Sequence, residues 1–230
     1  MREPVTSPDS SPVTLLVKEA LSVSGLLLAP AAARACYLLA HSAGAGMEHR
    51  SMRAVAAGLA DLGIATLRYQ FPYMERGSRR PDPPPLCHAT VRAAVAAAAR
   101  LLPALPLVAG GRSFGGRMTS QAQALEPLAG VRGLAFLGFP LHPAGEPADS
   151  RAQHLSEVSV PMLFLQGTRD ALAERSLLGA VVARLGARAT LSLVEGADHS
   201  FHVPAGSGRT DAQVLDDVLG RLAAWIDALM

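Results

Sequence analysis

Short apolar runs alternate with alanine-rich segments along most of the chain, and this alternation restricts the possible folds more than any other feature. The apolar runs have the length of buried strands, and the alanine-rich segments carry apolar residues at helical spacing. Strands separated by helices pair in parallel, because every crossover carries a helix back over the sheet. The pattern predicts strands at residues 23–28, 35–40, 64–71, 107–111, 133–139, 162–166 and 189–194, and helices at 52–62, 86–102, 117–125, 174–185 and 212–229.

The size and composition of the chain indicate one folded domain. Its 230 residues can build one substantial core, and half of them are hydrophobic while 17% are charged, which is a globular composition. Residues 1–12 contain three prolines and are not followed directly by an apolar signal-peptide segment, so they are predicted to be a disordered tail. Residues 13–230 are predicted to form a single α/β domain, with a doubly wound, mostly parallel sheet and helices on both faces.

Charge and cysteine content narrow the range of partners. The formal net charge is +2, and the arginines are scattered along the chain, which argues against nucleic acid binding. Cys36 and Cys87 are the only cysteines and lie far apart, as in proteins of a reducing cytoplasm, and they provide no metal-binding spacing. We therefore expect a cytoplasmic protein without a metal or a nucleic acid partner. Nothing in the sequence indicates an oligomeric state.

One apolar stretch, residues 26–45, has the length of a membrane span. It is interrupted by Pro30, Arg34 and His41, and each of these residues is costly at the centre of a bilayer. Two buried strands explain the stretch better than a membrane helix does. No membrane association is therefore expected.

The sharpest motif is Gly-Arg-Ser-Phe-Gly at residues 111–115, directly between a predicted strand and a predicted helix. A serine on such a tight turn exposes its hydroxyl, and its neighbours must be small because larger side chains would clash. The backbone N–H of Phe114 would face an oxyanion, which the helix dipole would also stabilise. A phosphate-binding loop would need Gly-Lys-Ser or Gly-Lys-Thr, whereas Gly-Arg-Met stands here. Ser113 is therefore predicted to be a nucleophile rather than an idle turn residue.

A serine hydroxyl needs a base to take its proton, and His199 is the best placed of the seven histidines. It lies between the last predicted strand and the last predicted helix, in a loop that suits a general base. Asp170 follows the predicted strand at 162–166, and its carboxylate is predicted to orient the imidazole. The chain order Ser113, Asp170, His199 supports this assignment.

Other residues compete for these roles. His202 is the natural alternative base, three residues further along the chain, and His142 is a weaker one. Asp198 adjoins the histidine in sequence, so its carboxylate would struggle to reach Nδ1 of His199. We therefore keep the first assignment as the prediction.

A second oxyanion donor is expected from the loop after an early strand. Residues 41–46 form such a loop, rich in small side chains that leave backbone N–H groups free to face a cavity. Ala43 is predicted to supply the donor, and His41 is predicted to organise the loop rather than to act as a base.

These segments together resemble the small α/β-hydrolases related to dienelactone hydrolases, which include the hydrolase-like domain of the NSL histone-acetyltransferase complex subunit 3. In the family the first matching stretch reads His-Gly-Ala-Gly-Ala-Gly, so Ser42 stands here in place of a glycine. The resemblance implies the α/β-hydrolase fold and the Ser113, Asp170, His199 triad, but no particular substrate. The matching stretches are Ala-His-Ser-Ala-Gly-Ala-Gly-Met at 40–47, Arg-Tyr-Gln-Phe-Pro-Tyr-Met at 68–74, Gly-Gly-Arg-Ser-Phe-Gly-Gly-Arg-Met at 110–118, Gly-Phe-Pro-Leu-His-Pro at 138–143, Leu-Gln-Gly-Thr-Arg-Asp at 165–170 and Gly-Ala-Asp-His-Ser-Phe at 196–201.

The sequence therefore predicts a serine hydrolase that cleaves a small carboxylic ester or thioester without a cofactor. The connection at residues 140–160 is too short for a large cap domain, so an open site is expected. Two alternatives remain: a non-catalytic interaction module of the same fold, and an acyltransferase or perhydrolase that uses the same triad. The residues predicted to line the substrate pocket are Tyr73, Met74, Phe139, Leu141 and His142.

Overall fold

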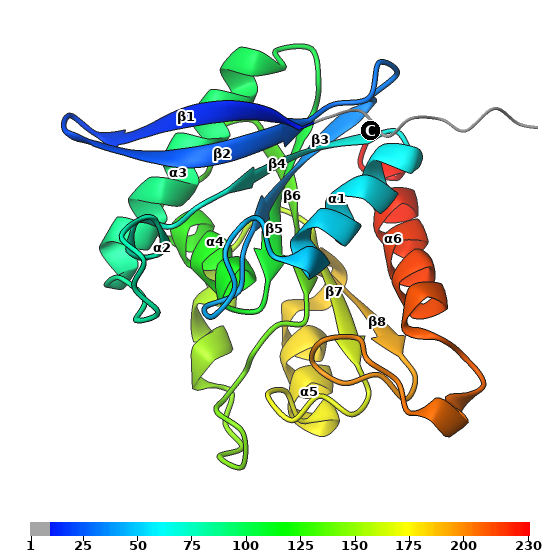
Figure 1. Ribbon diagram of the computed structural model, residues 1–230. Helices are drawn as coiled ribbons and strands as arrows, with labels where there is room; N and C mark the ends of the chain where they lie inside the picture. Colours follow the sequence, from blue (N-terminus) through cyan, green and yellow to red (C-terminus); the bar gives the residue numbers. More distant parts are fainter. Residues whose placement is uncertain (1–9) are drawn as a thin grey trace, which may run out of the picture.

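The computed structural model describes residues 10–230. The strands of this part of the chain form one sheet (Figure 1). The strand order is β1-β2-β4-β3-β5-β6-β7-β8. The β1–β2 and β2–β4 pairs are antiparallel, and the remaining neighbours are parallel, as the mostly parallel prediction requires. The strands are β1 Ser11–Lys18, β2 Leu21–Leu28, β3 Ala35–Ala40, β4 Ile64–Tyr69, β5 Leu107–Arg112, β6 Val131–Leu137, β7 Met162–Gly167 and β8 Ala189–Val194.

Helices cover both faces of this sheet (Figure 1). The apolar faces of α1 and α6 pack in one core cluster, and those of α3, α4 and α5 pack in the cluster on the other face. The helices are α1 Arg50–Asp61, α2 Pro72–Glu75, α3 Pro84–Leu101, α4 Phe114–Leu125, α5 Arg175–Leu185 and α6 Asp211–Asp227, with 3₁₀ turns η1 Ser150–Glu157, η2 Gly186–Arg188 and η3 Ala205–Ser207. Within the described part of the chain, no helix is both long enough and apolar enough to cross a membrane.

Strand β1 corrects the predicted tail at residues 1–12. It begins at Ser11, which pairs with Leu27, and Pro12 pairs with Leu26. The rest of the predicted tail, apart from Ser10, lies outside the described residues. β1 is an edge strand and most of its side chains are exposed, whereas β3, β4 and β7 are buried along their whole length. An edge strand lacks the continuous apolar run that reveals a central parallel strand.

Helix boundaries differ from the predictions by a few residues. α3 begins at Pro84, two residues before its predicted start, because proline is well tolerated in the first turn of a helix. α4 begins at Phe114 instead of near residue 117, so the helix starts immediately after Ser113. The short helix α2 was not predicted. The earlier start of α4 matters for function, because it places a free helix N-terminus next to the serine.

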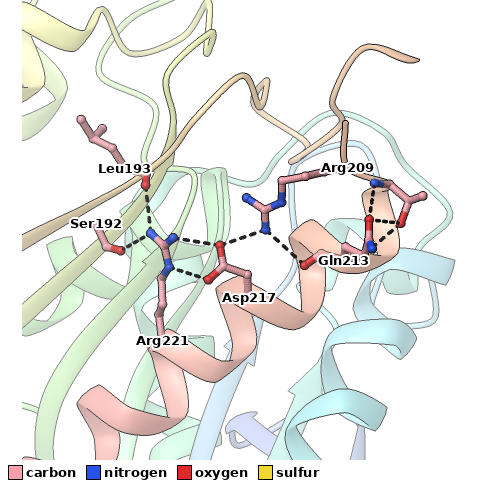
Figure 2. Close-up of polar contacts among 7 residues, drawn as sticks. Ser192, Leu193, Arg209, Gln213, Asp217 and Arg221 are labelled. Atoms are coloured by element: carbon pink, nitrogen blue, oxygen red, sulfur yellow. Dashed lines mark hydrogen bonds and ion pairs between the residues drawn. The ribbon is translucent and has the colours of Figure 1, made fainter. Parts of the chain in front are cut away.

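A charged network fastens α6 to the sheet (Figure 2). Asp217 accepts hydrogen bonds from both Arg221 and Arg209, at 2.8 Å and 3.1 Å. Arg221 also donates to Ser192 Oγ and to the carbonyl of Leu193 at the end of β8. The two ends of the loop between β8 and α6, which carries His199, are thus tied to the same helix.

Candidate active site

Ser113 occupies a strained turn between β5 and α4. Its backbone has φ 50° and ψ −117°, a region that non-glycine residues rarely adopt. Gly115 allows the turn to lie against the loop after β3, because a Cβ there would come within 2.6 Å of the carbonyl oxygens of Ala40 and His41. The turn therefore has the shape that the motif at 111–115 predicts.

The three side chains predicted to act together are in hydrogen-bond contact. Nε2 of His199 lies 2.8 Å from Oγ of Ser113, and Nδ1 of His199 lies 2.6 Å from Oδ2 of Asp170. An ionised carboxylate can only accept, so Nδ1 carries the proton and Nε2 is left to accept from the serine hydroxyl. The three residues follow the carboxyl ends of the parallel strands β5, β7 and β8, which is where this topology gathers reacting groups.

Gln166 holds the carboxylate and is a residue that the sequence analysis missed. Its Nε2 donates to Oδ2 of Asp170, while its Oε1 accepts from the N–H of Phe139 at 2.8 Å. The N–H of Leu172 donates to Oδ1 of Asp170 at 2.8 Å. Gln166 was detectable in principle, because it is a polar residue in an otherwise apolar strand and a buried amide needs partners.

The two residues predicted to supply oxyanion donors line the same cavity as Ser113. Phe114 is the first residue of α4, and Ala43 lies in the loop after β3; both line a cavity of about 360 Å³ together with Ser113. Across residues 10–230, neither of their backbone N–H groups donates to a protein acceptor. The structure therefore brings both predicted oxyanion donors to the serine.

His41 holds the loop at residues 41–46 in place, as predicted. Its Nε2 accepts from the N–H of Phe71 at 3.0 Å, and its Nδ1 donates to the carbonyl of Ser42 at 2.8 Å. Burial lowers the pKa of His41 to about 4. Both ring nitrogens are occupied, so His41 is neutral and has no free position with which to act as a base.

Tyr73 and Met74 line neither of the two cavities that contain Ser113, contrary to the prediction. The hydroxyl of Tyr73 donates to the carbonyl of Ala43 at 2.8 Å, and its ring is completely buried. Met74 packs against the main core cluster. The position of these residues after a strand correctly predicted the region of the molecule in which they lie. It did not predict the direction in which their side chains point. Tyr73 instead holds the loop that carries the Ala43 N–H.

Phe139, Leu141 and His142 were predicted pocket residues as well, and they too lie elsewhere. Phe139 and Leu141 are fully buried in the core. His142 is buried, with Nδ1 bonded to the carbonyl of Pro143 and Nε2 accepting from the N–H of Glu174. The same contacts remove His142 as an alternative base.

His202, the other alternative base, and Asp198, the alternative carboxylate, are also bonded to other partners. The exposed His202 pairs with Asp211 at 2.8 Å, and this carboxylate raises the pKa of His202. Asp198 accepts from the N–H groups of Ser200 and His202, so its carboxylate closes the turn instead of reaching His199.

Ser113 lies where two cavities meet, and neither resembles the predicted pocket. The larger one has a volume of about 460 Å³ and the smaller about 360 Å³. The larger is lined by Ser42, Gly44, Ala45, His49, Arg50, Ser51, Arg112, Ser113, His199, Ser200, His202 and Asp211. The smaller is lined by Ala43, Pro81, Asp82, Pro84, Ser113, Phe114, Arg117, Met118, Pro140, Arg151 and Leu172.

Solved structures of several hydrolases share this fold. A dienelactone hydrolase from Anabaena variabilis is 21% identical, with a TM-score of 0.75 over 97% of this chain and 99% of that one. An α/β serine hydrolase without a lid from Xanthomonas campestris is 19% identical, with a TM-score of 0.73 over 97% and 98%. A serine hydrolase homologue from Coxiella burnetii is 19% identical, with a TM-score of 0.71 over 96% and 99%. At these identities the likeness establishes the fold.

The sequence itself places the chain within a family. Residues 33–227 match the family described as the alpha/beta hydrolase domain, which is most of the sequence. The match runs from just before β3 to the last residue of α6, and so includes Ser113, Asp170 and His199. The chain therefore belongs to the α/β-hydrolase domain family.

Proposed function

We propose that this protein is a serine hydrolase that cleaves a small carboxylic ester or thioester. The observation that carries the proposal is the continuous hydrogen-bonded line from Ser113 through His199 to Asp170. Beside it lie the N–H groups of Phe114 and Ala43, which have no acceptor within the part of the chain that the structure describes. Nucleophile, base, orienting carboxylate and oxyanion donors are the parts that acyl transfer needs.

In the proposed reaction, Oγ of Ser113 attacks the substrate carbonyl while Nε2 of His199 takes its proton. The N–H groups of Phe114 and Ala43 stabilise the tetrahedral oxyanion, where one such donor is worth about 3 kcal/mol. His199 then protonates the leaving alcohol or thiol, and an acyl-serine remains. A water molecule, deprotonated by His199, hydrolyses this ester and restores the serine. Asp170 keeps the imidazole in the tautomer that can accept the first proton.

The proposed substrates are small. The connection between β6 and β7 contains the short turn η1 and no additional folded unit, so the cavities beside Ser113 open directly to solvent. We also propose a cytoplasmic location, which is supported by two buried free cysteines, Cys36 and Cys87.

Labelling with a fluorophosphonate and hydrolysis of p-nitrophenyl esters of increasing chain length test the proposal together. We expect one adduct, on Ser113, and hydrolysis of the short esters. Ser113→Ala should lose the adduct and lower kcat by about 10⁴- to 10⁶-fold. Exposed Ser156→Ala is the matched control and should behave as the unchanged protein. Hydrolysis that survives in the Ser113→Ala protein would exclude the serine mechanism.

A further inference from the structure

The smaller cavity beside Ser113 contains two arginines from different elements. Arg117 lies one turn into α4, and Arg151 lies in the 3₁₀ turn η1 between β6 and β7. In residues 10–230, neither guanidinium forms an ion pair with an acidic side chain. Arginines on protein surfaces are commonly paired or fully solvated, and two in one cavity indicate a place for negative charge.

Arg117 is the more constrained of the two. Its Nε is buried and has no hydrogen-bond partner among residues 10–230. Its guanidinium carbon lies 6.0 Å from the ring centre of Phe114, the residue whose N–H faces the oxyanion position. Burial, and then the positive charge of Arg151, lowers the pKa of the Arg117 guanidinium. A buried charged donor without an acceptor is costly, and an anion in the cavity would remove that cost.

An acidic residue of the same cavity does not supply the missing charge. Asp82 lines the cavity, but its carboxylate accepts from Arg76 and from the N–H of Tyr73 at 2.7 Å. Its side chain is only 6% exposed, so it is committed to these partners. The cavity therefore has a positive excess from Arg117 and Arg151.

We infer that the smaller cavity binds a carboxylate of the substrate, with Arg117 and Arg151 as its ligands. This inference rests on the proposed function and narrows its substrate to esters or thioesters that carry a second, anionic group. Phe114 and Ala43, the proposed oxyanion donors, line the same cavity, so the carboxylate and the reacting carbonyl would share a space of about 360 Å³. A short spacer between the two groups is required.

Two pairs of esters test the inference. In p-nitrophenyl hydrogen succinate the carboxylate is on the acyl side, and p-nitrophenyl levulinate is its uncharged counterpart of similar shape. In 4-acetoxybenzoate the carboxylate is on the alcohol side, and its methyl ester is the uncharged counterpart. The quantity compared is the ratio of kcat/KM for the charged ester to that for the uncharged ester, within each pair.

For at least one pair, Arg117→Met should lower this ratio by about 10- to 100-fold, the range for loss of hydrogen bonds to a charged group. Arg117→Lys keeps the charge but not the planar fork, and should give an intermediate ratio. Arg151→Gln should lower the ratio for the same pair. Arg132→Gln, an exposed arginine near the opposite end of β6, should leave both ratios unchanged.

The outcomes separate the two ideas. If the uncharged esters are hydrolysed with Ser113 and both ratios are the same in the unchanged and Arg117→Met proteins, the inference is wrong and the proposed function stands. If no ester is hydrolysed, the proposed function fails, and binding decides the inference. Monomethyl succinate, titrated into the Ser113→Ala protein and followed by NMR, should then bind, and binding should be lost with Arg117→Met; equal or absent binding in both proteins overturns it.

Discussion

The two sides of Ser113 differ in how their charged side chains are partnered. On one side, both oxygens of Asp170 and both nitrogens of His199 have partners within the protein. On the other side, Arg117 and Arg151 line the smaller cavity, and neither has an acidic partner in the described part of the chain. The first side is complete before any ligand arrives, as preorganised catalytic groups should be. The second is incomplete, which is typical of a place where a ligand supplies the missing charge.

Asp170→Asn would strongly weaken the complete side while leaving both the nucleophile and the base in place. The amide favours the wrong histidine tautomer, so Nε2 could no longer accept the serine proton. We expect kcat for a short p-nitrophenyl ester to fall by about 10³- to 10⁴-fold. Asn at the neighbouring acidic position, Asp198→Asn, should have a much smaller effect, because that carboxylate does not contact His199. Equal losses in the two variants would show that Asp170 has no special role.

Gln166→Leu would weaken the same side more gently. Asp170 would lose one donor and the N–H of Phe139 would lose its acceptor, while the three triad residues remain. We expect kcat to fall by about 10- to 100-fold with KM nearly unchanged, since the lost bond is to a charged group. The rate of fluorophosphonate labelling should fall in parallel.

Gln153→Leu, at an exposed position in η1, is the matched control and should keep both rates. A rise in KM without a fall in kcat in the Gln166→Leu protein would contradict a positioning role for Gln166.

Acid should lower the free energy of unfolding through His41, which holds the loop that carries Ala43. No change in the triad is needed for this effect. The pKa of buried His41 is about 4 in the folded protein, below its ordinary value of 6.5, so the unfolded chain takes up the proton first as the pH falls. The stability from neutral His41 is present above about pH 6.5 and is lost as the pH falls towards 4. At pH 5 the loss is about 2 kcal/mol in the free energy of unfolding.

Urea unfolding at pH 7 and at pH 5 measures this loss, and His41→Gln should reduce the pH-dependent part. An exposed histidine offers the control: His49→Gln should leave the difference between the two pH values unchanged. An identical pH dependence in the His41→Gln protein would show that the loss comes from other groups.

Much of the fold could be predicted because central parallel strands are visible in the sequence as continuous apolar runs. β3 and β8 have the predicted bounds, and the strand-to-helix turn at Ser113 follows from its glycines. β1 could not be predicted in this way, because most of its side chains are exposed. The relation to the NSL complex subunit stays a prediction.

The site was predictable where chain order fixes it and not where side-chain direction does. Ser113, Asp170 and His199 follow from their places after β5, β7 and β8. The pocket-lining residues did not, because a residue that follows a strand can turn inward, as Phe139 does, or face solvent. Arg117 and Arg151 meet only through the packing of η1 on α4, and no local pattern records that meeting.

The backbone conformation of Ser113 is less favourable for serine than for glycine. A left-handed conformation of this kind costs a non-glycine residue about 1–3 kcal/mol, whereas a glycine at an ordinary position costs about 0.5–1 kcal/mol through its greater freedom when unfolded. At this one position, then, replacement of the serine by glycine would stabilise the folded protein. If the proposed chemistry were no longer needed, this single replacement would be favoured by stability. The presence of serine at residue 113 is therefore explained by the proposed function and not by the stability of the fold.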